Sequence, residues 1–434
     1  MTKPFLIRRF FLLHMRPNHL PGSTLRYTHT WGLGGMAALL VTTLVLTGLL
    51  QILTYEPTPD HAYQSIIELE QTTLFGNLVR GIHHWSANLL IAVVLLHLLR
   101  VLFTGALTGP RRFNWIIGLG LLIGVLAANF TGYLLPWDQL SYWAVTICTG
   151  MLGYIPGIGG WLQTGIRGGA EVGPNTLLLF YSIHTALVPA ILVLLMGFHF
   201  WRIRKARGVV LPRAIDEVDP VGTERVQTWP DLLLREAVVG MVLLAVVLLL
   251  AVVETPELGT PANPGMSPNP AKAPWYFVGF QELQIQFHPV IAVLVIPVLA
   301  MLGLGFLPYR RWDSNPEGIW FGSRIGRRTA WVAAATALFT TPLLIVASEW
   351  WIQPTKLFPS WPLMLSNGLL PFSLIMAAVT AFFLIIRHRF KGTRDDAIQA
   401  VIVLLIVSFI VLTVTALWFR GEGMVLSWPW GNGA

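Results

Sequence analysis

Four histidines stand at matched spacings in segments that are otherwise apolar. His83 and His97 are 14 residues apart in "VRGIHHWSANLLIAVVLLHLLR", and His184 and His199 are 15 residues apart in "YSIHTALVPAILVLLMGFHFWR". On an α-helix these separations are about 3.9 and 4.2 turns, so each pair projects from one face over a rise of about 21–22 Å. His84 is about 3.6 turns from His97 and therefore points to the opposite side.

A metal bound between facing imidazoles is the chemistry that this arrangement predicts. If both segments cross a membrane in the same direction, His83 and His184 share the outer depth, and His97 and His199 share the inner one. Six-coordinate haem iron takes one axial nitrogen from each side, so we expect two non-covalent b-type haems. A lone intramembrane histidine more often hydrogen-bonds across helices, but two matched pairs favour ligation. Zinc is disfavoured because each depth offers two nitrogens and no thiolate.

Glycines repeat with the same period in two other apolar segments. Gly34 and Gly48 are 14 residues apart, and so are Gly118 and Gly132. Because glycine has no Cβ, a flat macrocycle can lie against the helix backbone there. Ordinary packing of small residues between helices is the alternative for glycines alone. Taken with the histidines, the pattern predicts four helices around two porphyrins.

Three arginines lie near the ends of these segments and have two possible roles. Arg80, Arg100 and Arg111 are placed where a guanidinium group could pair with haem propionates. They could equally anchor the helices at the lipid headgroups. The sequence leaves both interpretations open.

The elements that position these residues are membrane-spanning helices. Hydrophobic residues make up 54% of the chain and charged residues 12%, so we expect an all-α integral membrane protein. The single cysteine, Cys148, excludes an internal disulfide, a thiolate iron–sulfur cluster and a CxxCH haem attachment. Nine apolar segments are long enough to cross a bilayer core about 30 Å thick: 31–53, 82–103, 113–135, 176–201, 235–253, 287–307, 329–349, 364–386 and 398–419.

Lysine and arginine are concentrated in alternate connections, which predicts the orientation. The basic connections are 1–26, 100–112, 202–235, 308–328 and 387–394. By the positive-inside rule the N-terminus is then cytoplasmic and the C-terminus outside. The basic start "MTKPFLIRRFFLLHMR" has no small-residue cleavage site, so we expect it to remain as a surface helix. The pI of about 9.9 reflects inner loops and anionic lipid, and it is not a sign of nucleic-acid binding.

Residues 1–350 resemble cytochrome b, the haem subunit of the quinol:cytochrome c oxidoreductases. Besides the histidines and glycines, the resemblance rests on "TGYLLPWDQLSYWAVTICTG" (131–150), "IPGIG" (155–159) and "FYSIHT" (180–185). The spacing of His184 and His199 is similar to the chloroplast-type branch, in which a four-helix haem protein is separate from subunit IV. "WPDLLL" (229–234) and "PWYF" (274–277) resemble subunit IV, fused here into one chain.

The resemblance implies both an organisation and an activity. Residues 1–215 would form a four-helix dihaem domain, 216–350 a subunit IV-like quinol domain, and 351–434 two additional spans. Quinol would be oxidised at an outer site, one electron passing to a mobile Rieske iron–sulfur protein and the other across two b haems. Quinone would be reduced at an inner site, coupled to proton translocation. The implied setting is a dimeric complex with a c-type cytochrome subunit and membrane lipid, in the bacterial inner membrane.

The resemblance also assigns quinone-site residues. The outer site would draw on the 136–159 and 274–288 loops, with Tyr133, Pro136, Trp137, Pro274, Trp275 and Tyr276. The inner site would gather Arg204 and Asp231 near His199, together with the N-terminal surface helix. His14 and His19 are further contributors there or simply interfacial residues.

Three departures from the family pattern matter. Pro274 stands where the family's Pro-Glu-Trp-Tyr motif has its proton-accepting Glu. Glu282 is the first candidate to replace that Glu and His288 the second, with a solvated loop carboxylate as the alternative for Glu282. Gly32 stands where the chloroplast-type branch has the Cys that holds an extra haem, so we expect no covalent haem. The last of the two additional spans has no family counterpart.

Two other classes of protein compete with this interpretation. A dihaem b membrane anchor of a respiratory dehydrogenase also uses histidines on helices, but it needs no outer "PWDQ" loop and usually has four or five spans. A transporter would use polar intramembrane residues along a substrate path, but no inverted repeat is seen in the sequence. A reduced-minus-oxidised spectrum would separate these classes.

Overall fold

The structure is a bundle of long helices with one small sheet. A computed structural model describes residues 19–211, 225–313 and 318–429. Within these residues nine helical segments are long and apolar enough to cross a membrane, which confirms the prediction of an all-α membrane protein. They are Leu33–Ile52, Gly76–Phe103, Gly109–Tyr133, Pro174–Lys205, Thr228–Val253, Ile291–Tyr309, Arg324–Trp350, Leu365–His388 and Arg394–Trp418. The expected surface helix at the start of the chain and His14 lie outside the described residues.

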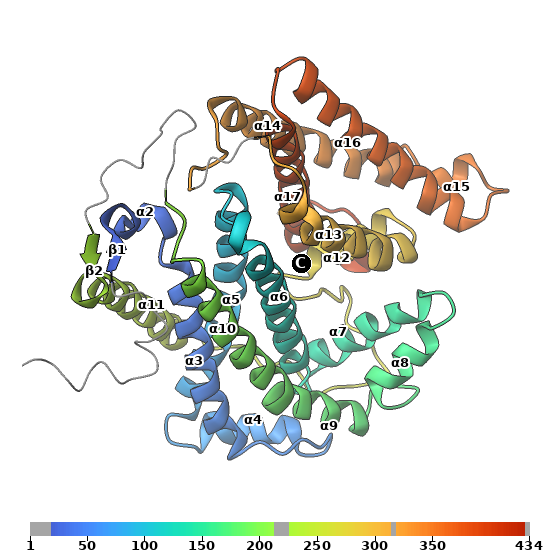
Figure 1. Cartoon of the computed structure of the whole chain (residues 1–434). Helices are drawn as coiled ribbons and strands as arrows, with labels where there is room; N and C mark the ends of the chain where they lie inside the picture. Colours follow the sequence, from blue (N-terminus) through green and yellow to red (C-terminus); the bar gives the residue numbers. More distant parts are fainter. Residues whose placement is uncertain (1–18, 212–224, 314–317, 430–434) are drawn as a thin grey trace, which may run out of the picture.

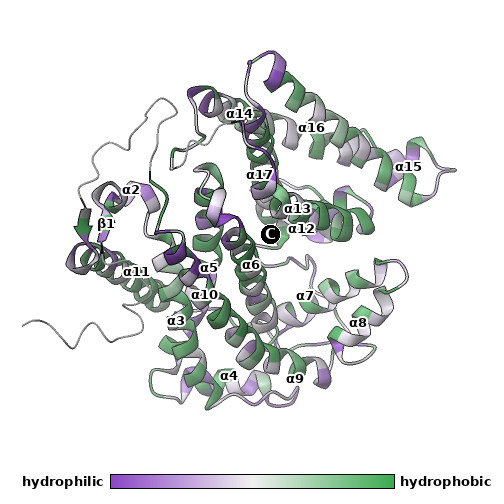
Figure 2. Ribbon diagram, viewed as in Figure 1, coloured by the Kyte–Doolittle hydropathy of each residue, from purple (hydrophilic) through white to green (hydrophobic). Residues whose placement is uncertain are grey.

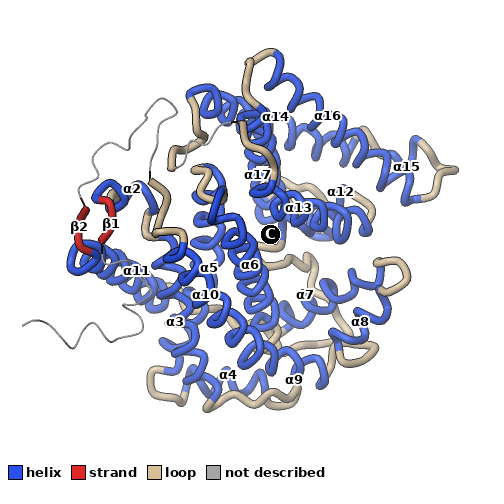
Figure 3. Tube along the Cα trace, in the orientation of Figure 1, coloured by secondary structure: helices blue, strands red, loops and turns tan. Residues whose placement is uncertain are grey.

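The elements follow one another along the chain, and the stretch 254–277 between α11 and α12 contains no helix or strand (Figure 1). The long helices are α3 (Leu33–Ile52), α5 (Gly76–Phe103), α6 (Arg112–Tyr133), α10 (Val188–Lys205), α11 (Leu233–Val253), α13 (Ile296–Phe306), α14 (Arg324–Trp350), α16 (Leu370–His388) and α17 (Arg394–Trp418). The shorter ones are α2 (Tyr27–Thr30), α4 (Ala62–Gln71), α7 (Gln139–Gly150), α8 (Gly159–Arg167), α9 (Pro174–Ser182), α12 (Val278–Gln286) and α15 (Pro354–Leu357). Strands β1 (His19–Pro21) and β2 (Arg225–Gln227) pair antiparallel, and Figure 3 shows them as the only strands drawn in the described part.

The first four spans form the bundle that carries the histidines. Helix α3 packs on α5, and α6 packs on α10. Buried aliphatic side chains such as Leu40, Ile91, Val125 and Leu192 fill the space between these four helices. Helix α11 packs on the periphery of this four-helix bundle, where it contacts both α5 and α3. Because lipid is as apolar as these side chains, close van der Waals packing rather than exclusion of water holds such helices together.

The second group of helices is built around α17. This last helix packs against α14, α12 and α16 (Figure 1). Its Ile402 and Ile406 also pack against the cluster that contains Trp115 and Leu119 of α6. The last span, for which we expected no family counterpart, is therefore central to the second group and links it to the first.

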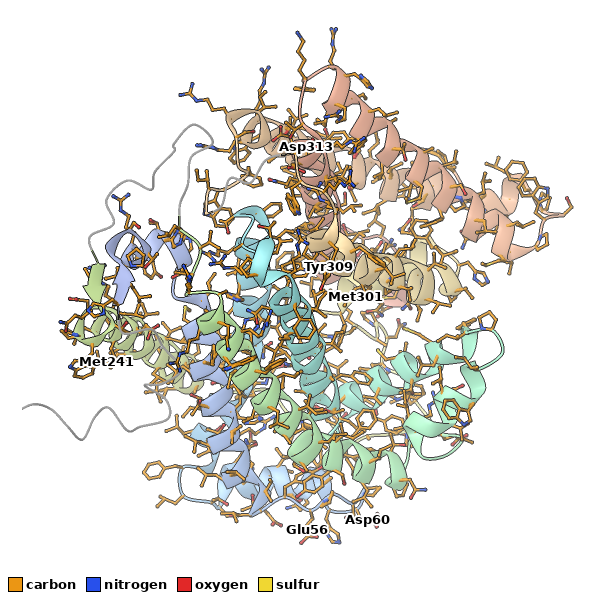
Figure 4. All side chains as sticks on the ribbon, in the orientation of Figure 1. Glu56, Asp60, Met241, Met301, Tyr309 and Asp313 are labelled. Carbon is orange, nitrogen blue, oxygen red and sulfur yellow. The ribbon has the colours of Figure 1, made fainter. Side chains whose placement is uncertain are left out.

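The connections between the long helices lie at two opposite ends of the molecule. Figure 2 shows mostly hydrophobic long helices, with hydrophilic residues gathered towards helix ends and loops. Glu56 and Asp60, from a connection expected outside, lie at the opposite end from Asp313, from a connection expected inside (Figure 4). Tyr63 in α4 donates to the carbonyl of Gly259 (2.9 Å), so two connections expected outside meet. Which end faces the cytoplasm remains a prediction.

Candidate functional site

The structure brings the four histidines together in two pairs. The ring centroids of His83 and His184 are 6.2 Å apart, and those of His97 and His199 are 6.5 Å apart. One ring of each pair comes from α5 and the other from the span that contains α9 and α10. His84 is exposed, and its ring lies edge-on against the neighbouring Trp85, away from both pairs.

The separation within each pair fits one metal between two imidazoles. Metal–nitrogen bonds to histidine are about 2 Å long, and the half-width of each ring brings centroids on opposite sides of one metal to about 6 Å. Among the described residues, no group of three or more His, Cys, Asp or Glu is placed to hold a metal ion. Each pair therefore offers two imidazole nitrogens, a donor set that would suit a metal whose other ligands come from a porphyrin.

Hydrogen bonds at Nδ1 fix the tautomer of both rings at one level. The hydroxyl of Thr47 donates to the carbonyl of Thr43 (2.8 Å), so it accepts from Nδ1 of His83 (2.9 Å). Nδ1 of His184 donates to the carbonyl of Ala128 (2.9 Å). Both Nδ1 atoms therefore carry the proton, which leaves the lone pair of each Nε2 free to bind a metal.

A local irregularity in the helix positions His184. The residue lies on a π-helical turn, Ile183–Leu187, between α9 and α10. Pro189 follows in the first turn of α10. Because proline has no N–H, the regular helical hydrogen bond to the carbonyl four residues earlier is missing and the chain widens there. Such turns inside helices occur frequently at functional sites.

Each of the four periodic glycines faces one of the four histidines. A Cβ added at any of them would meet the Cε1 atom of a histidine ring from a neighbouring helix. The pairs are Gly48 with His83 (3.3 Å), Gly34 with His97 (3.5 Å), Gly132 with His184 (2.5 Å) and Gly118 with His199 (3.6 Å). A Cβ at Gly35, by contrast, would meet nothing within 4 Å. The two sequence patterns thus converge on the same four places, and the absence of a Cβ at each glycine leaves room for the histidine ring that lies against it.

Arg80 is held by protein partners near the His83 end of α5. Its guanidinium group forms an ion pair with Glu70 of α4 and donates to the carbonyl of Pro256 (2.8 Å). The side chain is buried. Arg80 therefore ties α5 to two connections, and its pairing with a haem propionate stays a prediction.

At the other end, Arg100 and Arg111 bind backbone carbonyls. Arg100 is buried and its Nε donates to the carbonyl of His29 (3.0 Å). Arg111 donates to the carbonyl of Gly208 (3.2 Å). The sequence analysis did not single out His29, whose buried ring donates through Nε2 to the carbonyl of Val210 (2.7 Å). Burial, and then the charge of Arg100, lowers the pKa of His29.

Trp275 and Tyr276 connect the second half of the chain to the histidine bundle. Nε1 of Trp275 donates to Oδ1 of Asn88 in α5 (2.8 Å). Burial, with the neighbouring Tyr133 and Cys148, raises the pKa of Tyr276. The structure thus brings Tyr276 close to the end of α6 and to α7. A buried tyrosine whose pKa is raised stays protonated and can donate a hydrogen bond.

The other residues expected at the outer site flank this group. Trp137 is buried, has a left-handed backbone (φ 53°) and packs edge-on against Tyr142. Pro136 beside it is half-buried. The carbonyl of Pro274 accepts from the N–H of Phe277 (2.8 Å), in the turn that immediately precedes the start of α12. Nε2 of Gln284 donates to Sδ of Met151 (2.9 Å), so the 136–159 and 274–288 regions meet at the same end of the molecule.

Glu282 and His288 are placed differently from the sequence expectation. Glu282 lies in α12 and is fully buried, and it accepts from Nε (3.0 Å) and Nη2 (2.7 Å) of Arg420. Gln286 donates to it as well (3.0 Å). The backbone N–H of His288 donates to the carbonyl of Asn367, beside α16. Both carboxylate oxygens of Glu282 are therefore occupied by hydrogen bonds from Arg420 and Gln286.

The residues expected at the inner site lie on the surface. Arg204 and Asp231 are exposed, and Asp231 lies in the first turn of the π-helical segment Thr228–Leu232. His19 is exposed in β1. These side chains are accessible, but the contacts in the described structure do not join them to His199.

Comparison with known proteins places these residues in a family. The family description Cytochrome b/b6/petB matches residues 20–207, which include both histidine pairs and all four glycines. The chain is 41% identical over 172 residues to cytochrome b6 of Heliomicrobium gestii, covering 40% of this chain and 81% of that protein. It is 39% identical over 173 residues to cytochrome b6 of Chlamydomonas reinhardtii, covering 40% of this chain and 80% of that protein.

Structural similarity extends beyond the cytochrome b6 match. A chain in a solved structure named "Hyperthermophilic respiratory Complex III" aligns with a TM-score of 0.63, covering 89% of this chain and 91% of that chain. The sequence identity is 23%, so this match shows a shared fold and no more. The resemblance recognised in the sequence is confirmed by the cytochrome b6 matches, which span most of those proteins. The chain therefore belongs to the cytochrome b family, whose members carry b-type haem.

Proposed function

We propose that this chain is the dihaem cytochrome b of a bc-type complex that acts as a quinol:cytochrome c oxidoreductase. In this proposal quinol is oxidised at an outer site, electrons cross the membrane, and quinone is reduced at an inner site, coupled to proton translocation. The proposal rests on one observation: two facing pairs of histidines, His83–His184 and His97–His199, lie at different depths along α5. An electron path across the bilayer needs two carriers at different depths, and two such sites provide it.

The four histidines hold the haems in this proposal. His83 and His184 ligate one iron, and His97 and His199 ligate the other, through Nε2. Haem, when bound, supplies a one-electron carrier at each depth. The hydroxyl of Thr47 accepts from Nδ1 of His83 and so fixes the orientation of the ring, as hydrogen-bond acceptors behind metal-binding histidines do. Because Gly32 occupies the position of the extra-haem cysteine, both haems are non-covalent.

The outer quinol site is assigned to the group around Tyr276. Its protonated hydroxyl is suited to donate a hydrogen bond to a quinol oxygen. Trp275 holds the loop against Asn88 of α5, close in sequence to His83. Tyr133, Pro136, Trp137 and Pro274 complete the surroundings. Both oxygens of Glu282 are occupied by Arg420, so we do not assign proton acceptance to Glu282.

The remaining assignments concern setting and partners. We propose three parts, 1–215, 216–350 and 351–434, with the N-terminus in the cytoplasm of a bacterial cell and the C-terminus outside. Arg204 and Asp231, both exposed, contribute to the inner quinone site. A Rieske iron–sulfur protein and a c-type cytochrome act as electron acceptors within a dimeric complex. The charge distribution between alternate connections supports this orientation.

Turnover of the purified complex tests the proposal. The complex is incubated with a short-chain quinol and an oxidised c-type cytochrome, and cytochrome reduction is followed with and without Tyr276→Phe. We expect quinol-dependent reduction that is slowed by the substitution. A preparation that retains both b-type bands but reduces no cytochrome with quinol would contradict the proposal, and it would favour the membrane anchor of a dehydrogenase.

A further inference from the structure

The C-terminal end of α17 makes a buried ionic contact with α12. Arg420, two residues beyond α17, is almost fully buried, and its side chain is 0% exposed, like that of Glu282. Its Nε and Nη2 bind the two oxygens of Glu282 at 3.0 and 2.7 Å. Its Nη1 binds Glu349 of α14 at 2.8 Å. One guanidinium group therefore joins the middle of α12 to the C-terminal ends of α14 and α17.

Two further contacts join the same C-terminal segment to the loop before α12. Nζ of Lys272 donates to the carbonyl of Leu417 (2.9 Å). The backbone N–H of Gly423 donates to Oδ1 of Asn269 (2.6 Å). Arg420 also pairs with Leu426 in an isolated β-bridge, so the chain folds back on itself here. Residues 417–427 thus cross the 269–286 region at three separate places, which are Asn269, Lys272 and Glu282.

The three places lie on either side of the residues assigned to quinol. Trp275 and Tyr276 follow Lys272 and precede Glu282 along the chain. The side-chain amide of Gln281 in α12 binds the backbone before Trp275. It accepts from the N–H of Ala273 (2.9 Å) and donates to the carbonyl of Ala271 (2.6 Å). The turn that carries Trp275 and Tyr276 is therefore fixed at both ends, and the C-terminal segment supplies the outer contacts.

The ionic contact is the strongest of the three constraints. A buried carboxylate and guanidinium that share two hydrogen bonds are costly to separate, because either partner alone remains as an uncompensated buried charge. The contact at Lys272 is one charge-assisted hydrogen bond to a carbonyl, and the contact at Asn269 is one neutral hydrogen bond. Loss of Arg420 should therefore release α12 more than loss of either single bond.

We infer that residues 417–427 act as a clamp on the outer quinol loop, and that Arg420 is a positioning residue which sets how tightly quinol binds. The inference rests on the proposed function, since it assigns a role to the loop that carries Trp275 and Tyr276. It also gives a role to the last span, which brings Arg420 to Glu282 and has no counterpart in the family pattern. Arg420 does not act on the substrate itself.

The kinetic test uses Arg420→Gln in the assembled complex, with Asp395→Asn as the matched control. Asp395 forms an ion pair with Arg310 (2.7 Å) at the opposite end of the same helix. With a short-chain quinol, we expect Arg420→Gln to raise KM about tenfold while kcat at saturation changes much less. Both b-type bands should persist. An unchanged KM, or an equal rise in Asp395→Asn, would overturn the clamp.

Milder variants keep the test open if Arg420→Gln does not assemble. Asn269→Ala and Lys272→Met each remove one single hydrogen bond, and each should raise KM in the same direction by a smaller factor. Arg420→Lys keeps the charge but not the two-pronged geometry, so it should lie between wild type and Arg420→Gln. Variants that lower kcat without raising KM would contradict a positioning role.

A spin label separates the clamp from the quinol assignment. Ser267 is exposed in the same loop, and a label on Ser267→Cys reports the motion of the loop without any substrate. Wild type labelled in parallel gives the background signal, which includes any label on Cys148. We expect Asn269→Ala or Arg420→Gln to increase label mobility, whereas Asp395→Asn should not. If the complex oxidises no quinol, the proposed function fails, but the label still shows whether residues 417–427 restrain the loop. Unchanged label mobility in Asn269→Ala and Arg420→Gln would overturn the clamp.

Discussion

The rings of His83 and His184 lie 6.2 Å apart, although α6, α7, α8 and α9 separate them along the chain. Each ring is held from behind at Nδ1, by the Thr47 hydroxyl and the Ala128 carbonyl respectively. Both Nε2 atoms are therefore available as ligands, which is the state that axial coordination requires. His83 and His184 are thus the pair of nitrogen donors that a haem of this family would use at one of the two depths.

The close approach of Gly132 to His184 predicts the effect of adding one methyl group. A Cβ at Gly132 would lie 2.5 Å from Cε1 and 2.9 Å from Nδ1 of the ring, so Gly132→Ala must displace it. We expect loss of one b-type band. Gly35→Ala has open space and should keep both bands. Alanine favours the helix by about 1 kcal/mol over glycine, so helix destabilisation would not explain a loss in either variant.

The hydrogen bond from His83 to Thr47 predicts a change in redox potential. Thr47→Val keeps the shape of the side chain but removes the hydroxyl that accepts from Nδ1. A ring that loses this partner is a weaker donor to iron. We expect one haem midpoint potential to rise while the other stays unchanged in a redox titration. Equal shifts in both haems, or none, would show that Thr47 does not act on a single haem.

Tyr276 is expected to act on the substrate rather than on the fold. Tyr276→Phe removes one hydroxyl whose raised pKa keeps it protonated. Because one neutral hydrogen bond contributes about 1 kcal/mol, kcat/KM for quinol should fall roughly fivefold to tenfold. The haem spectrum should not change. Unaltered kcat/KM would remove Tyr276 from the outer site.

The setting of Cys148 predicts how its alkylation depends on pH. Burial raises the pKa of the Cys148 thiol from 9.0 to about 11. Only the thiolate reacts, so at pH 8 alkylation should be about a hundredfold slower than for an ordinary cysteine, and the rate should keep rising towards pH 11. Labelling of the exposed Ser267→Cys gives the reference. Equal rates at pH 8 would contradict the raised pKa of the half-buried Cys148.

The features that depend on local periodicity were predictable from the sequence. The nine spans follow from apolar runs of sufficient length. That His83 and His97 project from the same side of one helix follows from their spacing. The same reasoning predicted that His84 points elsewhere, and in the structure its ring lies edge-on against Trp85. That His84 binds no haem stays a prediction. These are properties of single segments, so no knowledge of the packing was needed.

The setting of Glu282 shows where this reasoning ends. The carboxylate lies in a loop region by sequence, but its environment is set by α17 and by Arg420, more than a hundred residues later. Neither residue has a spacing or motif that indicates the other. His29 is similar, because its buried contact with Val210 depends on how two connections approach each other. Contacts between distant segments require the tertiary structure.

A reduced-minus-oxidised spectrum of single histidine variants tests the central claim most directly. The purified wild-type protein should show two b-type components. His83→Ala should lose one of them, His97→Ala the other, and His84→Ala neither. A colourless wild type, or a preparation in which His84→Ala loses a haem and His83→Ala keeps both, would contradict the account.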